Sequence, residues 1–410
     1  MKAAARSPLA PAAFPALPHV RGVRAATGAL GLYKHAREDL QVFAFAEGTS
    51  VAGAFTTSAT RSADVDWCRA ALPGGMARAL VCNAGNSNAF TGAAGVAKNV
   101  ATAEEAARLL ACAPDCVFIA ATGVIGQPLE PRRVAQALPG LVERLGAPDW
   151  ERLAQTFMTT DTFAKGAGGV VDLDGVEVRL AGLAKGSGMI APDMATMLVF
   201  VFTDAAVSPA VLQACVNAHL GATFNAITVD GDTSTSDTLL VFATGASGAP
   251  MLNSLSDARF AAFSQALGAV MRDLALQVVR DGEGARKLIE VRVEGAASEA
   301  DARRVARAIA NSPLVKTAIA GEDANWGRVA MAVGKSGAEV VRERLSIRFG
   351  PEWTARDGGA APYDEAAVDA HMRADNIEIE VRLGLGEGRA CMWTCDLTDG
   401  YISINGAYRS

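Results

Sequence analysis

The sequence predicts a globular protein of mixed α/β class with extensive β-sheet. Half of its 410 residues are hydrophobic and only 20% are charged, a balance that excludes a disordered chain. Short runs rich in Val, Phe and Ile alternate with longer segments that have helical spacing. Residues 197–202 are continuously apolar, which is typical of a strand buried at the centre of a sheet. The length allows two ordinary domains or one large α/β domain.

The first half of the chain alternates strand-like and helix-like segments. Residues 1–15 are expected to be a loose tail, because prolines at positions 8, 11, 15 and 18 interrupt any helix there. Strands are predicted at residues 41–45, 51–56, 79–83 and 117–121. Helices are predicted at residues 99–112, 132–145 and 150–158.

The second half repeats the mixture, without a fixed-period repeat or a clear flexible linker. After the apolar strand at 197–202, helices are predicted at residues 209–220, 257–280 and 298–311. Further strands are predicted at residues 287–293, 328–333, 377–383 and 389–397. The Gly- and Ala-rich residues 355–362 are expected to form a surface loop.

Composition argues against several function classes. The net charge is −6, and no Lys/Arg cluster with interleaved aromatic residues indicates a nucleic-acid ligand. No apolar run approaches the roughly 20 residues that span a bilayer, so no membrane partner is expected. The seven scattered cysteines are an odd number, which indicates a reducing compartment and a cytoplasmic protein. No metal is expected, because the two C-x3-C pairs lack suitable spacing or further ligands.

Three short motifs are interpreted as plain turns. Residues 332–336 resemble the end of a phosphate-binding loop, but Val329 stands where its first glycine belongs. Residues 230–234 resemble the start of a calcium loop, but Thr235 and Val241 replace its glycine and its bidentate glutamate. The glycine-rich residues 384–388 lack the strand and helix that flank a dinucleotide site.

The stretch from Lys185 to Phe200 is the most informative. It combines a glycine turn, a proline and a small residue with a threonine, Thr196, at the start of the apolar strand. On spacing alone, the commoner explanation is a loop that leads into a β-strand. The functional interpretation is that the Thr196 hydroxyl attacks the carbonyl of Ala195 and cuts the chain. Thr196 would then have a free α-amino group, whose ordinary pKa of about 7.7–8.0 suits a general base.

The sequence resembles the ornithine acetyltransferases, also called glutamate N-acetyltransferases or the ArgJ family. The resemblance extends over nearly the whole chain from about residue 14, and its blocks occur in the family's order. The blocks are residues 47–53, 121–126, 159–162, 185–190, 194–198, 224–235, 280–285, 325–328 and 401–410.

The resemblance implies a layered αββα sandwich of the DmpA/ArgJ type with a self-made N-terminal nucleophile. Cleavage between Ala195 and Thr196 would leave an alpha chain, 16–195, and a beta chain, 196–410, assembled as two copies of each. Thr196 would carry acetyl from N2-acetylornithine to glutamate in a ping-pong cycle of arginine biosynthesis, with no cofactor. Acetyl-CoA is a co-substrate in some members, and the resemblance leaves its use here open.

The resemblance also implies individual roles. Thr122 and Gly123 match the family's oxyanion pair. The family's substrate contacts match Thr162, Lys185, Thr196, Glu283, Asn405 and Ser410. Lys185 suits a substrate carboxylate, and Glu283 suits the terminal ammonium of ornithine.

The sequence departs from the family pattern at a few positions, and two other functions stay open. Ala407 replaces an acidic residue between Asn405 and Ser410, which puts affinity more than reaction type in doubt; Ala121, Ser58 and Ala324 are further departures. One alternative is a related self-processing aminopeptidase or amidase that passes the acyl group to water. The other is a non-catalytic protein that only assembles with partners.

Overall fold

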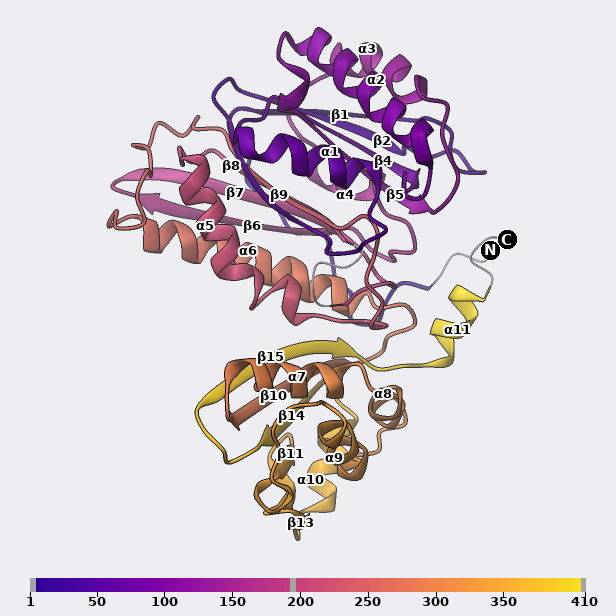
Figure 1. Ribbon diagram of the computed structural model, residues 1–410, viewed down its shortest axis with the longest axis vertical. Helices are drawn as coiled ribbons and strands as arrows, with labels where there is room; N and C mark the ends of the chain where they lie inside the picture. The colour runs from indigo at the N-terminus through magenta and orange to yellow at the C-terminus, as the bar shows by residue number, and fades with distance from the viewer. Residues whose placement is uncertain (1–4, 192–196, 407–410) are drawn as a thin grey trace. The chain divides into compact units, whose positions relative to one another are not determined.

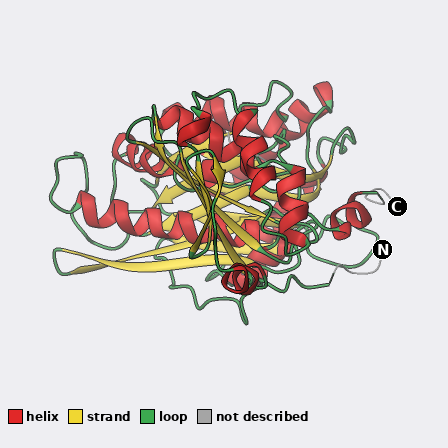
Figure 2. Ribbon diagram, turned by 90° about the horizontal axis from the view of Figure 1, so that it is seen from below, coloured by secondary structure: helices red, strands yellow, loops and turns green. Residues whose placement is uncertain are grey.

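The computed structural model describes residues 5–191 and 197–406. The chain divides into two compact units, and each is built from segments that are not contiguous in the sequence. The larger unit contains Ala12–Asn225 and Asp232–Ala275, and the smaller contains Met1–Pro11, Ala226–Gly231 and Leu276–Ser410. Figure 1 traces the elements of both units by residue number, and Figure 2 distinguishes helices from strands.

The first sheet of the larger unit has four strands. Its order is β1 (Val23–Gly28), β2 (Leu40–Phe45), β4 (Ala79–Asn86) and β5 (Val117–Val124). Only the β4–β5 pair is parallel, so these two strands end at the same edge. Two helices, α2 (Gly92–Leu110) and α3 (Arg133–Val142), cover its outer face (Figure 1). Two smaller helices of this unit are α1 (Ala63–Ala71) and α4 (Trp150–Thr156).

The second sheet of the larger unit has five strands. Its order is β3 (Ser50–Phe55), β9 (Thr238–Ala243), β8 (Leu198–Thr203), β7 (Val176–Lys185) and β6 (Lys165–Leu173). The helix α5 (Pro209–Leu220) packs on β3, and α6 (Phe260–Arg280) packs so closely on β7 that a Cβ at Gly182 would lie 2.8 Å from a Leu274 methyl. The larger unit is therefore an αββα sandwich, which confirms the predicted fold.

Side-chain alternation along the strands explains the layers. In β2, Leu40 and Val42 belong to the cluster under α2 and α3, whereas Phe43 and Phe45 belong to the core between the sheets. Successive side chains of a strand point to opposite faces, so a strand covered on both faces is mostly apolar, and in β2 the buried Gln41 is the polar exception. Aromatic rings join the sheets, with centroids of Phe43 and Phe202 4.8 Å apart.

The smaller unit contains a six-stranded sheet with helices packed on it. Its strand order is β13 (Gly359–Ala360), β12 (Glu352–Arg356), β11 (Ser346–Phe349), β14 (Asn376–Arg382), β10 (Leu288–Ala296) and β15 (Gly388–Cys395). The helices are α7 (Glu299–Ala310), α8 (Pro313–Ala320), α9 (Trp326–Gly334), α10 (Glu365–Met372) and α11 (Asp399–Asn405). The apolar faces of α7, α8, α9 and α10 and the sheet form one core, which includes Val305, Ile319, Val333 and Met372.

Most predicted elements are present, with ends shifted by a few residues, and two predictions are wrong. Residues 328–333 form part of helix α9 and not a strand. Val329, Ala332 and Val333 are its buried positions, a helical spacing, and Asn325 caps it by accepting a hydrogen bond from the Arg328 amide at 3.1 Å. Residues 355–362 are not simply a loop, because the ends of β12 and β13 pair there.

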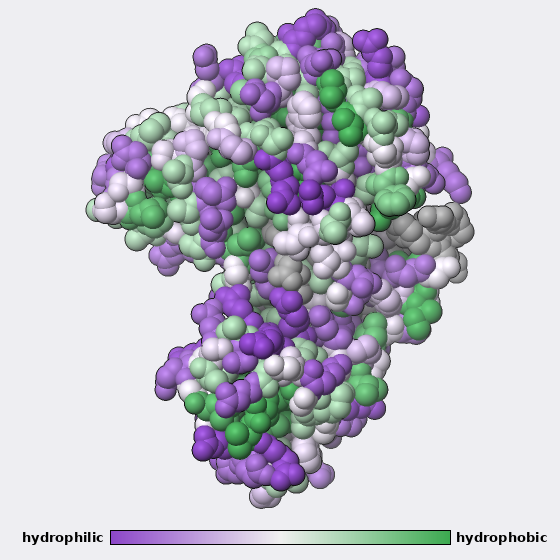
Figure 3. Space-filling model, viewed as in Figure 1, coloured by the Kyte–Doolittle hydropathy of each residue, from purple (hydrophilic) through white to green (hydrophobic). Residues whose placement is uncertain are grey.

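Residues 5–15, predicted as a loose tail, make specific contacts. The Ser7 hydroxyl donates to the carbonyl of Arg280 at 2.6 Å within the smaller unit. In the larger unit, Phe14 lies against Gly166, where an added Cβ would be 2.5 Å from the ring. Among the described residues, no helix has both the length and the apolarity to cross a membrane. The face in Figure 3 mixes hydrophilic and hydrophobic side chains.

Candidate active site

The predicted oxyanion pair lies at the end of β5. Thr122 and Gly123 stand opposite Ala84 and Gly85 of the parallel strand β4. Gly123 has φ +130°, and a Cβ there would lie 2.4 Å from the carbonyl carbon of Gly85. Only glycine therefore fits this position, and the close approach of the two strands fixes where the Gly123 peptide lies.

Lys185, a predicted substrate contact, meets the oxyanion pair. It is the last residue of β7, and its Nζ donates to the Thr122 hydroxyl at 3.1 Å. Both side chains are buried. Sheet one and sheet two thus bring together two residues that are 63 positions apart in the chain. A buried ammonium beside a hydroxyl and glycine amides forms an environment that favours negative charge.

Asp161 is a residue that sequence reasoning did not single out, although its block was recognised. Its Oδ1 accepts from Lys165 Nζ at 2.6 Å and from the Gly186 amide at 2.7 Å. Burial by itself raises the pKa of Asp161, but the ammonium groups of Lys165 and Lys185 and the Gly186 N–H outweigh it and hold the pKa below its usual range. Asp161 is therefore a fixed negative charge that anchors the glycine turn after Lys185.

Asp237 is a second residue that the sequence did not reveal. It precedes β9, is fully buried, and its Oδ1 accepts from the Met197 amide at 2.7 Å. Burial raises its pKa well above the usual value, against the opposing effects of the Met197 N–H and the Lys185 ammonium. The carboxyl group therefore favours its neutral form. The Ser-Asp-Thr sequence at 236–238 is typical of a turn before a strand, so no local pattern distinguishes Asp237 from an ordinary turn residue.

The predicted nucleophile itself lies outside the described residues, as does Ala195. The structure does describe the chain on both sides. Strands β7 and β8 are antiparallel neighbours, with Lys185 opposite Leu198, so the segment 186–197 connects adjacent strands of one sheet. Thr162 is half-buried in the turn next to Asp161, and the Thr160 and Ser187 hydroxyls share a hydrogen bond of 2.7 Å beside it.

The other predicted substrate contacts belong to the smaller unit. Glu283 is buried, and its Oε2 accepts from Asn405 Nδ2 at 2.5 Å. The loop that carries Glu283 is held by the Thr398 hydroxyl, which donates to the Gly284 carbonyl at 2.7 Å. Gly284 has φ +75°, and a Cβ there would lie 2.8 Å from Gly400. Ser410 and Ala407 lie outside the described residues.

The predicted residues therefore form two clusters. Thr122, Gly123 and Lys185 are together in the larger unit, and Glu283 and Asn405 are together in the smaller one. Within residues 5–191 and 197–406, no three His, Cys, Asp or Glu side chains are arranged to hold a metal ion. Burial raises the pKa of the Cys68 and Cys82 thiols to about 12, so these two cysteines are inert.

Comparison with known proteins gives one consistent result. The sequence model described as "ArgJ family" matches residues 24–410. The arginine biosynthesis bifunctional protein ArgJ of Caulobacter vibrioides is 53% identical over 403 residues, which cover 97% of this chain and 100% of that protein. The protein of the same name from Bradyrhizobium diazoefficiens is 54% identical over 408 residues, covering 98% and 99%. A crystal structure of the Bacillus halodurans argJ protein is 46% identical, with a TM-score of 0.50, and covers 52% of this chain and 100% of its own.

Proposed function

This chain belongs to the ArgJ family, and from that premise we propose that it is an acetyltransferase of arginine biosynthesis. It moves an acetyl group from N2-acetylornithine to glutamate, and Thr196 carries the group between them. The observation that carries the proposal is the Lys185–Thr122 hydrogen bond. It unites a buried cation, the oxyanion pair and the end of the strand that precedes the nucleophile segment.

Self-cleavage makes the nucleophile. The Thr196 Oγ attacks the carbonyl carbon of Ala195, and the Ala195–Thr196 C–N bond breaks as the nitrogen gains a proton. Water then hydrolyses the resulting ester, which leaves a carboxylate on Ala195 and a free amine on Thr196. The fragments stay associated because β7 and β8, one from each fragment, are hydrogen-bonded along Leu180–Lys185 and Leu198–Thr203.

Two observations support cleavage at this bond. Asp237 holds the amide of Met197, one residue after Thr196, and Asp161 holds the amide of Gly186 at the other end of the connection. The Bacillus halodurans chain aligns over its full length with 52% of this one. Cleavage would leave a fragment of 215 residues (410 − 195), which is a similar share.

Acetyl transfer uses the same nucleophile twice. The free amine of Thr196 takes the proton from its own hydroxyl while Oγ attacks the acetyl carbonyl of acetylornithine. The Thr122 hydroxyl and the Gly123 amide donate to the oxygen on which negative charge develops. The bond from the acetyl carbon to the ornithine nitrogen then breaks, and ornithine leaves as that nitrogen takes the proton from the Thr196 ammonium. The amino group of glutamate then attacks the acetyl-Thr196 ester by the reverse steps. Each oxyanion donor is worth about 3–4 kcal/mol in comparable sites.

Substrate recognition is assigned to charged groups that the fold keeps buried. Lys185 pairs with the α-carboxylate that both amino acids share, and Thr162 contributes from the adjoining turn. Glu283, held by Asn405, pairs with the terminal ammonium of ornithine. Ser410 completes the predicted contacts. Two alpha and two beta chains assemble in the proposed enzyme.

The names of two relatives suggest a second activity beside acetyl transfer from acetylornithine. The Caulobacter and Bradyrhizobium proteins are named bifunctional. Acetyl-CoA is the candidate second donor, because the same acetyl-Thr196 would form from its thioester and pass to glutamate.

One experiment separates the proposal from its alternatives. Purified protein is mixed briefly with N2-acetylornithine, quenched and measured by denaturing mass spectrometry. Two fragments, with the one that begins at Thr196 heavier by about 42 Da, would support cleavage and a covalent acetyl-enzyme. Loss of that mass to glutamate, with acetylglutamate as product, distinguishes a transferase from a hydrolase that releases acetate. An intact chain with no adduct would refute the mechanism.

A further inference from the structure

The oxyanion pair is clamped by the loop that follows β4. Both the amide and the hydroxyl of Ser87 donate to the carbonyl of Val124, at 3.2 and 3.0 Å. The Gly126 amide donates to the Ala89 carbonyl at 3.0 Å. Gly85 is in such close contact with Gly123 that no Cβ fits between them. The position of the Gly123 peptide therefore depends on the conformation of residues 85–89.

This loop has a strained backbone. Asn88 has φ +52° and Phe90 has φ +57°, which is the left-handed region that residues with side chains seldom adopt. The ring of Phe90 is 82% exposed, so packing of that side chain does not compensate. The loop must be held by other contacts, and beside those of Ser87 and Ala89 they include the contacts of the Asn88 side chain.

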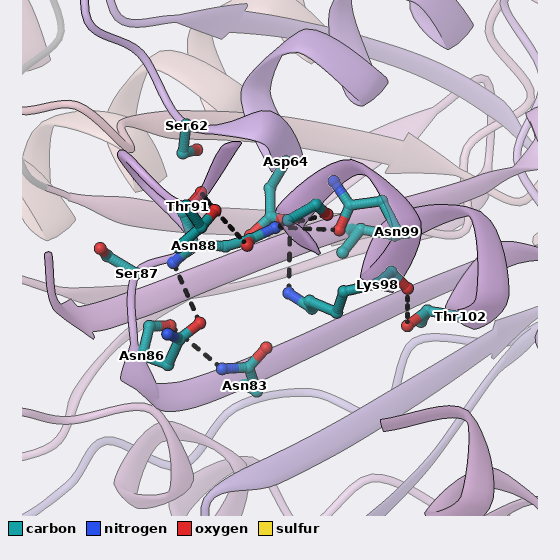
Figure 4. A network of polar contacts seen from close by, with 12 residues as sticks. Ser62, Asp64, Asn83, Asn86, Ser87, Asn88, Thr91, Lys98, Asn99 and Thr102 are labelled. Carbon is teal, nitrogen blue, oxygen red and sulfur yellow. Dashed lines mark hydrogen bonds and ion pairs between the residues drawn. The ribbon is translucent and has the colours of Figure 1, made fainter. Parts of the chain in front are cut away.

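Asn88 is the centre of a buried polar network formed with Asp64, Thr91, Lys98 and Asn99 (Figure 4). Its Nδ2 lies 2.8 Å from Asp64 Oδ1 and 3.2 Å from Asn99 Oδ1, and its Oδ1 accepts from the Thr91 hydroxyl at 2.9 Å. Lys98 Nζ forms an ion pair with Asp64 Oδ1 at 3.3 Å. We call these five residues the Asn88 network.

Helix α2 is shaped to receive Asn88. A Cβ at Gly95 would lie 2.6 Å from Asn88 Oδ1 and 2.1 Å from the Thr91 hydroxyl oxygen. Any other residue at position 95 would push the amide of Asn88 out of the helix surface. From there the contacts continue to Asn86, since the Asn88 amide donates to Asn86 Oδ1 at 3.0 Å and Asn86 Nδ2 donates to the Gln127 carbonyl. Asn86 is also the partner of Thr122 in the β4–β5 register.

Stability alone does not account for a buried ion pair in this place. Lys98 and Asp64 are 1% and 2% exposed, and desolvation of such a pair commonly cancels its attraction, so an apolar pair of similar volume is often as stable. A charged pair whose hydrogen bonds run to a strained loop is suited to holding one conformation of that loop.

We propose that the Asn88 network positions the oxyanion pair, so that Lys98, Asp64 and Asn88 are positioning residues for acetyl transfer. The inference rests on the proposed function, because it assigns the network to the reaction of Thr122 and Gly123. Removing the Lys98 ammonium leaves the Asp64 carboxylate buried without its cation. We expect the loop of residues 85–89 to shift so that water reaches this carboxylate. The Gly123 amide then moves from the place where the oxyanion forms, and small displacements of this kind cost up to about 100-fold in rate.

The test compares three variants of the full-length, self-processed protein in the acetylornithine–glutamate assay. Lys98→Met is expected to lower kcat by about 10- to 100-fold with KM within about twofold. The double variant Asp64→Asn with Lys98→Met is expected to recover most of kcat, because Asn accepts the Asn88 bond and no charge is stranded. Ala106→Gly, in the buried core of the same helix, is the matched control for lost stability. It is expected to lower the melting temperature and leave kcat unchanged.

Three results would overturn the inference. One is Lys98→Met with wild-type kcat and only a lower melting temperature, as in the control. Another is a double variant as slow as the single one, which would mean that the lysine charge acts on the reaction by itself. If Lys98→Met does not fold, Thr91→Val removes one hydrogen bond from the half-buried edge of the network. It is expected to lower kcat by about three- to tenfold, and an unchanged kcat would be the third such result.

Thr122→Ala separates this inference from the proposed function. Wild-type protein that transfers no acetyl to glutamate, or a Thr122→Ala variant as fast as wild type, would refute the function or the oxyanion assignment. A slow Thr122→Ala beside a fast Lys98→Met would refute the positioning role alone.

Discussion

The amide nitrogen of Met197 donates a hydrogen bond of 2.7 Å to Oδ1 of Asp237. The two residues are 40 positions apart, and the bond fixes the chain one residue after Thr196. A buried carboxyl group, whose pKa is raised by burial, thus holds the amide that immediately precedes strand β8.

Asp237→Asn is expected to be more stable than the wild type, by a difference in free energy of unfolding that grows as the pH rises. Burial raises the pKa of Asp237 in the folded protein, above about 3.9 in the unfolded chain. For an acid shifted this way, the stability it contributes is complete below the unfolded pKa and is lost as pH rises toward the folded pKa. Asparagine avoids this loss and still offers an oxygen to Met197. Melting temperatures of both proteins from pH 4 to 8 should diverge, and parallel curves would contradict a raised pKa.

Asp237→Ala serves as the comparison for cleavage. It removes the acceptor for the Met197 amide, so we expect self-cleavage to slow by at least about tenfold, while Asp237→Asn still cleaves. Timed gel analysis of the two fragments measures both rates. Equal rates for Ala and Asn would show that the hydrogen bond does not govern cleavage.

Thr196→Ala is expected to abolish both cleavage and acetyl transfer, because no hydroxyl remains to attack either carbonyl. Thr196→Ser keeps the hydroxyl and is expected to retain part of each. Fragment masses and acetylglutamate formation report the two steps. Cleavage at 195/196 in the alanine variant would require another nucleophile.

Gly123→Ala is expected to lower kcat by at least about 100-fold, because a methyl group at 2.4 Å from Gly85 must displace the oxyanion peptide. Gly126→Ala is the matched control. Gly126 also has a positive φ, +79°, but no atom lies within 4 Å of its added Cβ. The Gly126→Ala variant has the same kind of backbone strain but no steric clash like that of Gly123→Ala with Gly85, so its kcat should stay near the wild-type value. Similar losses in both variants would assign the effect to strain.

Glu283→Ala is expected to spare self-cleavage and raise KM for acetylornithine by about tenfold or more, since one charge-assisted bond to the terminal ammonium is lost. Glu387→Ala, at a side chain 95% exposed in the same unit, is the control and should change neither. Initial rates over a range of acetylornithine concentrations give the result. An unchanged KM in Glu283→Ala would remove this residue from ornithine recognition.

The sequence predicted many of the local elements close to their observed bounds. Helix α5 was predicted at 209–220 with the observed bounds, and the strand after Thr196 differs by one residue at each end. These segments have strong periodicity or continuous apolarity, which are properties of neighbouring residues. The failure at 328–333 has the same origin, because Arg-Val-Ala-Met-Ala-Val reads as a strand until the cap at Asn325 and the core around Val333 are known.

Sequence alone identified the family's blocks in order and through them predicted the αββα fold, which the structure confirms. The roles of the Ala195–Thr196 bond and of Thr122, Gly123, Lys185 and Glu283 stay predictions that rest on the same blocks. Tertiary structure decided which of them meet, and it revealed Asp161, Asp237 and the Lys98–Asp64 pair. A buried charge is costly unless it is paired with an opposite charge or with hydrogen bonds. Such partners lie far along the chain, 34 positions apart for Lys98 and Asp64. No local pattern distinguishes such a lysine from a solvated one.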